Sequence, residues 1–416
     1  MSTDLDDRDR SLLAGEHGAG AAFAMRIVVR LAELQGAPRL RDVTRAHVDS
    51  CLYHGRAGLD FAERLRAGGA EVAVPTTLNV SSLDLLHPEL VRLDDETRDL
   101  ARRLMDAYVA MGCRPTWTCA PYQLADRPGF GEHVAWAESN AIVFANSVMG
   151  ARTNRYGDFI DACAAVTGRV PDSGLHTDEG RRATVVVRLV GLPASLLDSD
   201  VLFPVLGHLL GGIAGTEVAA IVGLPPETGE DRLKALGAAA ASSGALALFH
   251  AVGVTPEAPT VDVVLADGAR EVEVTGRDLR AARDALAPIP AGAEIAAVSV
   301  GTPHASADEL RRLAELVHDD PPRVPLYVNT GRVQVAGLGD VASDLADGGV
   351  TVVTDTCTYI TPVIGDVTGP VMTDSGKWAW YAPSNLGVQV ALGSLQECAR
   401  SAAAGRVVRD ETLWGT

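Results

Sequence analysis

The sequence lacks several short motifs that mark common classes of enzyme and metalloprotein. Its 416 residues include six cysteines, at positions 51, 113, 119, 163, 357 and 398, and no two of them form a Cys-x-x-Cys pair. An ordinary zinc ribbon or thioredoxin motif is therefore excluded, and any metal site has to be assembled from loops distant in sequence. No Gly-x-Gly-x-x-Gly motif follows a first strand, and no Gly-x-Ser-x-Gly elbow is present. These absences argue against a dinucleotide site and an α/β-hydrolase.

Positive charge and long apolar runs are also scarce. Lysine and arginine together number 36 against 54 aspartates and glutamates, which gives a formal net charge of −18. Such an acidic balance argues against a nucleic acid or an anionic membrane as partner. The first ten residues contain no apolar core of a secretory signal, and the longest apolar stretch, 201–216, is too short to cross a bilayer. We therefore expect a cytoplasmic protein with no nucleic-acid and no membrane partner.

The hydrophobic pattern predicts an α/β fold with a helical N-terminal part. Apolar residues spaced by three and four predict helices over 7–34, 56–68 and 94–111. From about residue 115, short β-branched runs that end in Gly, polar or Pro residues predict buried strands, at 141–147, 183–191, 217–224, 245–253, 295–301, 325–330 and 351–356. The later runs alternate with helices, which indicates parallel sheets with right-handed crossovers. The stretch 257–292 is expected to form an elaboration or small hairpin.

The length predicts more than one domain. We expect residues 1–195 to form a helical and α/β lobe and residues 196–416 to form a second α/β lobe.

The polar loops between Cys119 and Arg155 are the strongest candidate for an active site. Ligands bind beyond the carboxyl ends of the strands in parallel sheets, and the run 129–155 is the densest in polar residues. Arg152 and Arg155 suit bidentate binding of a carboxylate or phosphate. The alternative is a helix N-terminus with a solvated basic face. A short helix is expected to carry Glu132, His133 and Glu138, of which the first two are acid, base or ligand candidates, although lone residues of this kind are more often structural.

Two cysteines lie in loop contexts that differ from those of the other four. Cys119 and Cys357 each end a β-branched or aromatic segment, beside a threonine and shortly before a proline. Thiolate ligands of iron–sulfur clusters lie on such loops, whereas Cys51, Cys113, Cys163 and Cys398 are expected to be packing residues. Further along, the segment 374–377 places Lys377 after a tight polar turn, which resembles an anion cradle without P-loop spacing.

Taken together, segments along nearly the whole chain resemble the aconitase X family, the branch of the aconitase superfamily that contains hydroxy-acid dehydratases. The matching segments are LLAGEHGAGAAFAM near the start, VPTTLN (74–79), CAPY (119–122), GEHVAWAESNAIVFANSVMGARTNR (131–155), GLHTDE (174–179), LKALGAAAASSGALALFHAVGVTPEAP (233–259), PHAS (303–306), TDTC (354–357), SGK (375–377) and YAP (381–383). The resemblance implies a multi-domain Rossmann-like aconitase core that eliminates water from a small hydroxylated acid at an iron–sulfur centre. It also implies a separate small swivelling-domain subunit as partner.

The resemblance and the loop positions together assign the expected site. We expect His304, Ser375 and Lys377 to be catalytic, Cys119 and Cys357 to be metal ligands, and substrate, a small anion, to be bound by Asn146, Ser147, Arg152, Thr153, Arg155, Thr330 and Asp374. Ser375, His304 or a residue of the partner subunit is the candidate general base.

The chain departs from the family pattern at three positions. Thr302 stands where the pattern has a third cysteine, Asp374 where it usually has asparagine, and Trp380 where it has histidine. A hydroxyl is a poor substitute for a thiolate at iron. Two cysteines with His304 or Asp355 could hold a mononuclear or partly oxygen-ligated metal in place of an iron–sulfur cluster. Two alternatives stay open: a metal-independent isomerase or cyclase, as in secondary metabolism, and a non-catalytic subunit.

Overall fold

The computed structural model describes residues 3–365 and 367–414 and divides into two compact units. The first contains the chain up to Leu83 together with Leu93–Arg182, and the second contains Asp84–Arg92 and the chain from Ala183 onward. The predicted lobe boundary after residue 195 lies inside the second unit. Within the described part of the chain, no helix is both long enough and apolar enough to cross a membrane.

The first unit is rich in helices around short strands, as its sequence pattern predicts. Strand β2 pairs in parallel with β3 on one side and β4 on the other, and β1 pairs antiparallel with β5. The helices are α1 (Asp7–Ala14), α2 (Ala19–Gln35), α3 (Arg56–Ala67), α4 (Asp95–Ala110), α5 (Ser139–Ser147) and α6 (Ile160–Thr167). The strands are β1 (Leu40–Asp42), β2 (Ala46–Val48), β3 (Thr76–Leu78), β4 (Ala135–Trp136) and β5 (Arg169–Pro171).

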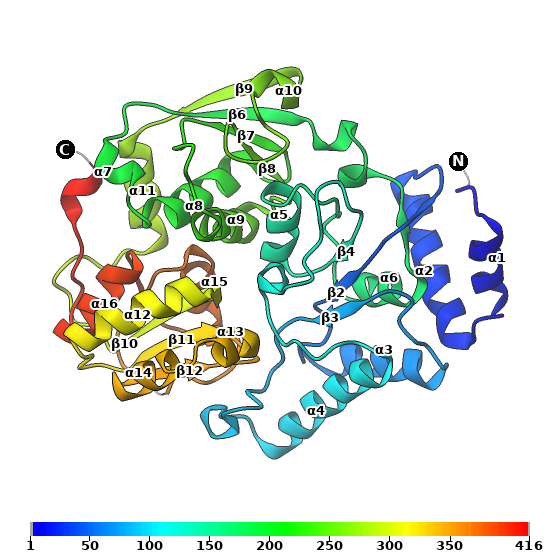
Figure 1. Ribbon diagram of the computed structural model, residues 1–416, viewed down its shortest axis with the longest axis horizontal. Coiled ribbons are helices and arrows are strands. Elements are labelled where there is room, and N and C mark those ends of the chain that lie inside the picture. Colours follow the sequence, from blue (N-terminus) through cyan, green and yellow to red (C-terminus); the bar gives the residue numbers. More distant parts are fainter. Residues whose placement is uncertain (1–2, 366, 415–416) are drawn as a thin grey trace. The chain divides into compact units, whose positions relative to one another are not determined.

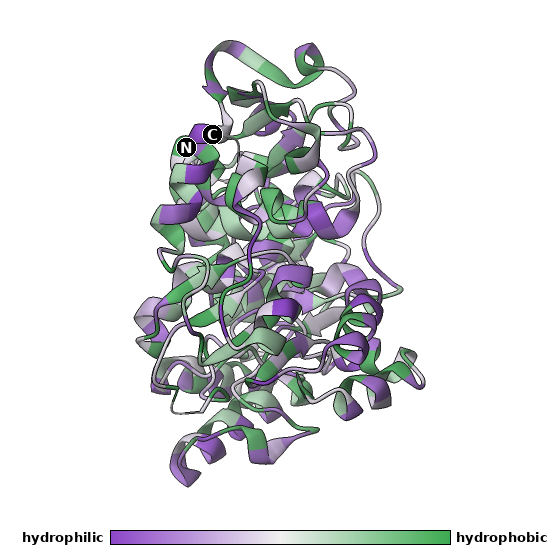
Figure 2. Ribbon diagram, turned by 90° about the vertical axis from the view of Figure 1, so that its left-hand side faces the viewer, coloured by the Kyte–Doolittle hydropathy of each residue, from purple (hydrophilic) through white to green (hydrophobic). Residues whose placement is uncertain are grey.

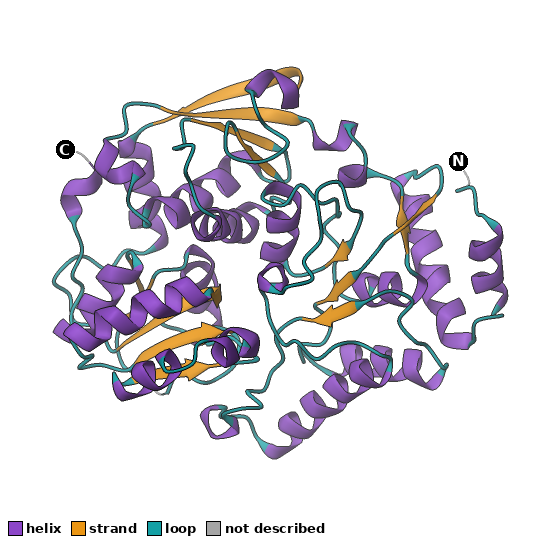
Figure 3. Cartoon of the chain, viewed as in Figure 1, coloured by secondary structure: helices purple, strands orange, loops and turns teal. Residues whose placement is uncertain are grey.

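The second unit contains two fully parallel sheets, shown in orange in Figure 3 with helices around them. The four-stranded sheet has the order β8-β7-β6-β9 and the five-stranded sheet the order β12-β11-β10-β13-β14. The strands are β6 (Ala183–Leu189), β7 (Ala219–Val222), β8 (Phe249–Ala251), β9 (Leu265–Val274), β10 (Ala297–Ala305), β11 (Leu326–Thr330), β12 (Val350–Val353), β13 (Val371–Thr373) and β14 (Val390–Leu392). This agrees with the predicted alternation of strand and helix.

Helices connect and cover these strands (Figure 1). They are α7 (Ala194–Leu197), α8 (Leu202–Ala214), α9 (Glu230–Gly244), α10 (Val261–Val264), α11 (Gly276–Leu286), α12 (Ala307–Asp319), α13 (Arg332–Gly337), α14 (Val341–Asp347), α15 (Gly376–Leu386) and α16 (Leu395–Ala404). Hydrophobic and hydrophilic residues are interleaved along the helices (Figure 2). In α12, Leu310, Leu313, Ala314 and Val317 form the buried face, at the three- and four-residue spacing of an amphipathic helix.

The strand order of the five-stranded sheet identifies where a ligand is expected. The chain runs from β10 outward through β11 to β12, then returns to β13 on the other side of β10 and continues to β14. The direction of winding therefore reverses between β10 and β13. In doubly wound sheets, ligands bind beyond the carboxyl ends of the strands at this point.

Several predictions of local structure are wrong. The run 141–147 forms helix α5 rather than a strand, because Glu138 caps its N-terminus by accepting from the backbone N–H groups of Asn140 and Ala141. Since this run is buried on all sides, periodicity could not separate helix from strand. The stretch 257–292, expected to form an elaboration or small hairpin, forms no hairpin: it contains α10, then β9, which pairs in parallel with β6, and then α11. The single helix expected over 7–34 is broken between α1 and α2.

Candidate functional site

A bulge at the carboxyl end of β10 carries the first group of predicted site residues. The register of β10 against β11 shifts between Val300 and Ala305, so that residues 301–304 leave the regular ladder. Gly301 begins the bulge with φ of 77°, and a Cβ atom there would lie 2.5 Å from the carbonyl oxygen of Asn329. Only glycine is therefore compatible with this turn. Bulges next to ligand sites redirect side chains out of the alternation of a strand, as happens here for residues 302–304.

His304 is fully buried within this bulge and is neutral at physiological pH. Its Nε2 atom lies 3.1 Å from the carbonyl oxygen of Thr356. Because a carbonyl can only accept, Nε2 carries the proton, and Nδ1 is the nitrogen with a lone pair that a metal can use. Burial lowers the pKa of His304 to about 4, the hydrogen bond to Thr356 opposes this, and the charge of Lys234 lowers it further. A neutral imidazole is the form that ligates metals.

The loop that carries Cys357 is held by a network of buried polar contacts. Every residue from Thr354 to Thr358 is buried, and Asp355 adopts φ of 61°. Arg332 binds both carboxylate oxygens of Asp355, at 2.8 and 2.5 Å. Asp84 accepts hydrogen bonds of 2.8 Å from the backbone N–H and from the hydroxyl of Thr354. These contacts fix the backbone on the N-terminal side of Cys357.

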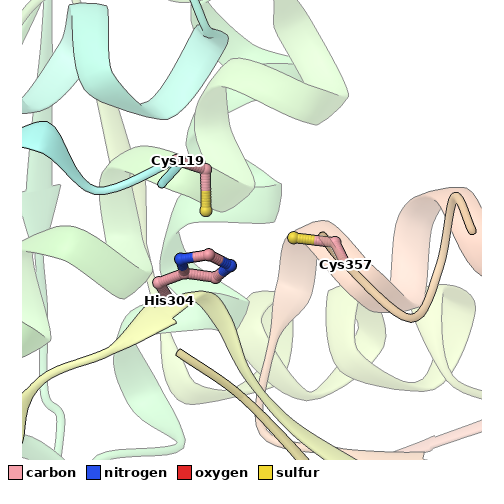
Figure 4. Close-up of side chains that lie close together, drawn as sticks. All are labelled: Cys119, His304 and Cys357. Carbon is pink, nitrogen blue, oxygen red and sulfur yellow. The ribbon is translucent and has the colours of Figure 1, made fainter. Parts of the chain in front are cut away.

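Cys119, His304 and Cys357 form a group of possible metal ligands (Figure 4). One ligand atom from each residue lies within 4.8 Å of the others, and all three side chains are buried. Cys119 lies on a loop of the first unit, where the amide of Asn140 donates 3.0 Å to its carbonyl oxygen. His304, which the sequence suggests both as a catalytic residue and as a ligand, thus joins the two predicted ligands, Cys119 and Cys357.

The donors of this group suit a transition metal. Thiolate sulfur and imidazole nitrogen both bind iron, and three protein ligands leave a position for a substrate oxygen. Thr302, which stands at the position of the third expected cysteine, has its hydroxyl 3.3 Å from the amide nitrogen of Asn329. That hydroxyl is a hydrogen-bond acceptor in the bulge.

The predicted residues 374–377 lie at the end of β13, beside the bulge. Gly301 donates its backbone N–H to Asp374 at 3.2 Å, which joins the two strand ends. Burial raises the pKa of Asp374 to about 7, and the charge of Glu309 adds to this. Ser375 is the N-cap of α15, and its hydroxyl accepts from the backbone N–H of Trp378 at 3.0 Å. Asp374 therefore connects the ends of β10 and β13, the two strands at the topological switch point, and Ser375 caps the helix that follows β13.

Close packing against two other helices surrounds the start of α15, where Lys377 lies. A Cβ atom at Gly376 would lie 2.7 Å from Cβ of Ala239 in α9 and 2.9 Å from the carbonyl oxygen of Pro204 in α8. Glycine at this position lets the start of α15 approach both helices. Lys377 is buried, and its Nζ atom lies 5.9 Å from the ring centroid of Tyr359. Thr330, at the end of β11, is also buried and donates 2.9 Å to the carbonyl oxygen of Ala305.

In the first unit, Asn146 and Thr153 bind each other. The amide nitrogen of Asn146 donates a hydrogen bond of 2.8 Å to the carbonyl oxygen of Thr153, and the amide oxygen accepts one of 3.0 Å from the backbone N–H of Thr153. Arg181 donates to the side-chain and main-chain oxygens of Asn146. Ser147 is buried at the end of α5. The predicted loop is therefore held by hydrogen bonds among its own residues and to Arg181.

The two arginines of the predicted anion clamp have different surroundings. Arg152 lies 2.5 Å from the carboxylate of Asp178 and donates to the carbonyl oxygen of His176 at 3.3 Å. Arg155 is exposed. The roles of these residues, and those of Asn146, Ser147, Thr153 and Thr330 in binding substrate, stay predictions.

The helix expected to carry Glu132 and His133 is not formed, which corrects that prediction. Both residues lie outside any helix, and the backbone of His133 forms an isolated parallel β-bridge with Arg152. Glu132 binds Arg45 at 2.8 Å, and His133 hydrogen-bonds His176 at 3.0 Å. Burial lowers the pKa of His133 to about 4, followed by the charge of Arg41. These contacts are structural.

Sequence reasoning missed three residues that organise the site: Asp84, Arg332 and Lys234. Arg332 lies two residues after the predicted strand 325–330, a position that could have suggested it. Lys234 is buried between Asp231, at 3.0 Å, and Glu309. No local pattern in the sequence indicates its pairing with Glu309, 75 positions away.

Known proteins resemble this chain over most of its length. Family models for the first, second and third domains of aconitase X match residues 2–179, 183–284 and 295–404. The cis-3-hydroxy-L-proline dehydratase of Pseudomonas aeruginosa is 44% identical over 99% of this chain and 72% of its own length. The phosphomevalonate dehydratase large subunit of Methanothermobacter thermautotrophicus is 38% identical over 92% of this chain and 95% of its own.

A solved structure supports the same assignment. The crystal structure of Thermococcus kodakaraensis aconitase X in its holo-form is 33% identical and superposes with a TM-score of 0.86, over 96% of this chain and all of that one. The predicted α/β aconitase-type fold is confirmed, and so is the enzyme class, since both named relatives are dehydratases. The chain therefore belongs to the aconitase X family.

Proposed function

We propose that this chain removes water from a small hydroxylated carboxylic acid at an iron centre held by Cys119, His304 and Cys357. The observation that carries the proposal is the buried group of two thiols and one imidazole. Iron bound there would act as a Lewis acid on the leaving hydroxyl. Relatives that act on cis-3-hydroxy-L-proline and on phosphomevalonate make these two compounds the first substrates to test.

The chain's own residues would bind the acid and move its proton. Lys377 is a buried cation at the start of α15, where the positive end of the helix dipole adds to its attraction for a carboxylate. Ser375 suits the general base, because the backbone N–H of Trp378 and the helix dipole stabilise negative charge on its oxygen. Once its own proton has been lost to solvent, the Ser375 alkoxide would take the proton α to the carboxylate and return to a neutral hydroxyl.

A small second polypeptide is proposed as partner. The chain matches 95% and 99% of the length of two relatives named as large subunits, and 72% of the length of the Pseudomonas dehydratase. Co-expression with a small swivelling-domain protein encoded nearby, followed by affinity purification of the tagged chain, tests this. A stable complex in equal amounts is expected; failure to co-purify with any such protein would contradict the partner proposal.

The activity itself is tested by incubating anaerobically purified protein, with and without that partner, with each of the two acids. Formation of the unsaturated or cyclised dehydration product, measured by mass spectrometry as a loss of one water, is expected with one of them. Turnover by protein that contains no iron would instead favour the metal-independent alternative.

A further inference from the structure

The side chain of Asn329 joins the two loops that carry His304 and Cys357. Asn329 is fully buried near the end of β11, between the bulge 301–304 and the loop that ends at Thr358. We propose that Asn329 is a positioning residue that sets the separation of His304 from Cys357 and thereby the affinity of the metal site. This inference rests on the proposed metal site.

The orientation of the Asn329 amide follows from its partners. Its oxygen accepts from the backbone N–H of Thr358 at 2.9 Å, so this atom is the acceptor. Its nitrogen lies 3.0 Å from the carbonyl oxygen of Val300, which can only accept, so this atom is the donor. One hydrogen bond therefore holds the residue after Cys357, and another holds the residue at which the β10 ladder is interrupted.

The second amide hydrogen reinforces both connections. The nitrogen of Asn329 lies 3.1 Å from the hydroxyl oxygen of Thr358 and 3.3 Å from that of Thr302. Since an amide nitrogen has two hydrogens and three acceptors lie within reach, one hydrogen is shared. Asn329 thus contacts the bulge through Val300 and Thr302 and the cysteine loop through two atoms of Thr358.

The hydroxyl of Thr358 has no capacity for a substitute partner. It accepts from Asn329 and from the indole N–H of Trp378 at 3.1 Å, which uses both lone pairs. Its proton must then be donated to the hydroxyl of Ser299, 2.7 Å away. Removing the Asn329 amide would leave buried polar groups unpaired on both loops, and each loop could then relax separately.

The experiment compares Asn329→Ala with a matched control. Ser401→Ala, in α16, also removes a fully buried polar group, one with bonds to Glu397 and to both polar backbone atoms of Val408, but it contacts neither loop. The full-length proteins are stripped of metal and titrated anaerobically with Co²⁺, read by thiolate-to-cobalt absorption. We expect Asn329→Ala to weaken Co²⁺ binding by roughly 10- to 100-fold, the usual effect of losing a residue that orients metal ligands. Ser401→Ala should lower the Tm and leave Co²⁺ affinity unchanged.

A second measurement does not depend on metal. The alkylation rates of Cys357 and of Cys398, which is buried in α16, are compared by peptide mass spectrometry in metal-free protein. Asn329→Ala should raise the rate for Cys357 at least about tenfold without changing that for Cys398, because only the first loop loses its anchor. If Asn329→Ala does not fold, Asn329→Asp, which keeps the shape and the acceptor, replaces it in both measurements.

The outcomes separate the two proposals. A wild-type chain that binds no Co²⁺ overturns the metal site, and Cys357 alkylation still decides the role of Asn329. Unchanged Cys357 alkylation and unchanged Co²⁺ affinity in the Asn329 variant overturn the positioning role. Equal effects in the Ser401 variant overturn it as well, since they would trace to general destabilisation.

Discussion

Nε2 of His304 lies 3.1 Å from the carbonyl oxygen of Thr356, the residue immediately before Cys357. The backbone of the cysteine loop therefore selects the histidine tautomer that leaves the lone pair on Nδ1. The loop thus holds one proposed ligand directly and orients a second through its carbonyl group.

Replacing His304 should reduce iron binding. His304→Gln removes the imidazole while keeping a polar side chain of similar length, so we expect iron content after anaerobic reconstitution to fall at least about tenfold. His318→Gln, at an exposed position of α12, is the control. Full iron content in both variants would show that His304 is not a ligand.

Replacing Ser375 should affect catalysis more than stability. We expect Ser375→Ala to lower kcat by about 100-fold or more through loss of the base, and to cost about 1 kcal/mol of stability through loss of the helix cap. Ser394→Ala removes the equivalent cap of α16, whose hydroxyl accepts from Glu397. It should cost similar stability with kcat unchanged. Similar kcat values in the two variants would show that Ser375 only caps α15 and is not the base.

Asp374 should make stability fall as the pH rises. Burial raises its pKa in the folded protein to about 7, from the usual 3.8 of an aspartate. Such a group contributes stability that is present below pH 4 and is lost as the pH rises through about 7. Asp374→Asn cannot lose a proton here, so its free energy of unfolding in urea, relative to that of the wild type, should increase between pH 4 and pH 8. We expect the increase to be about 1–3 kcal/mol, because Asp374 is only partly buried.

The control for this pH series is Asp347→Asn, at an exposed position at the end of α14. Its unfolding free energy should follow that of the wild type at every pH. A constant difference between Asp374→Asn and the wild type across the series would contradict the assigned titration.

Arg332 should be required for the stability of the cysteine loop. Arg332→Gln leaves the fully buried carboxylate of Asp355 without its cation, and we expect a loss of about 3 kcal/mol in urea unfolding. Arg311→Gln breaks an exposed pair with Asp308 and should cost less than about 1 kcal/mol. Equal losses would mean that the Arg332 pair contributes no more than a surface ion pair.

Much of the fold could be predicted because its signals are local. The strands near 183, 217, 295 and 325 are apolar runs bounded by breakers, and their alternation with helices indicates parallel pairing. Helix α5 was mistaken for a strand because its cap, Glu138, is not one of the residue types commonly expected at that position.

The site was predictable in parts and unpredictable in its connections. Cys119 and Cys357 stand out on loops, and His304 follows shortly after the predicted strand 295–301. The bulge at 301–304 depends on a register shift against β11, and the contacts of Asn329 with Thr358 and of Lys234 with Glu309 join residues far apart in sequence. Such pairings arise from tertiary packing, which a single sequence does not encode in any short pattern.

The most direct test of the proposed function is anaerobic reconstitution with iron and sulfide, with iron content, optical and electron-paramagnetic spectra and dehydratase activity measured on the same samples. Wild type and Cys398→Ser should bind iron and be active, whereas Cys119→Ser and Cys357→Ser should lose both together. Dehydratase activity that survives unchanged in the last two variants, without iron, would contradict the proposed metal centre.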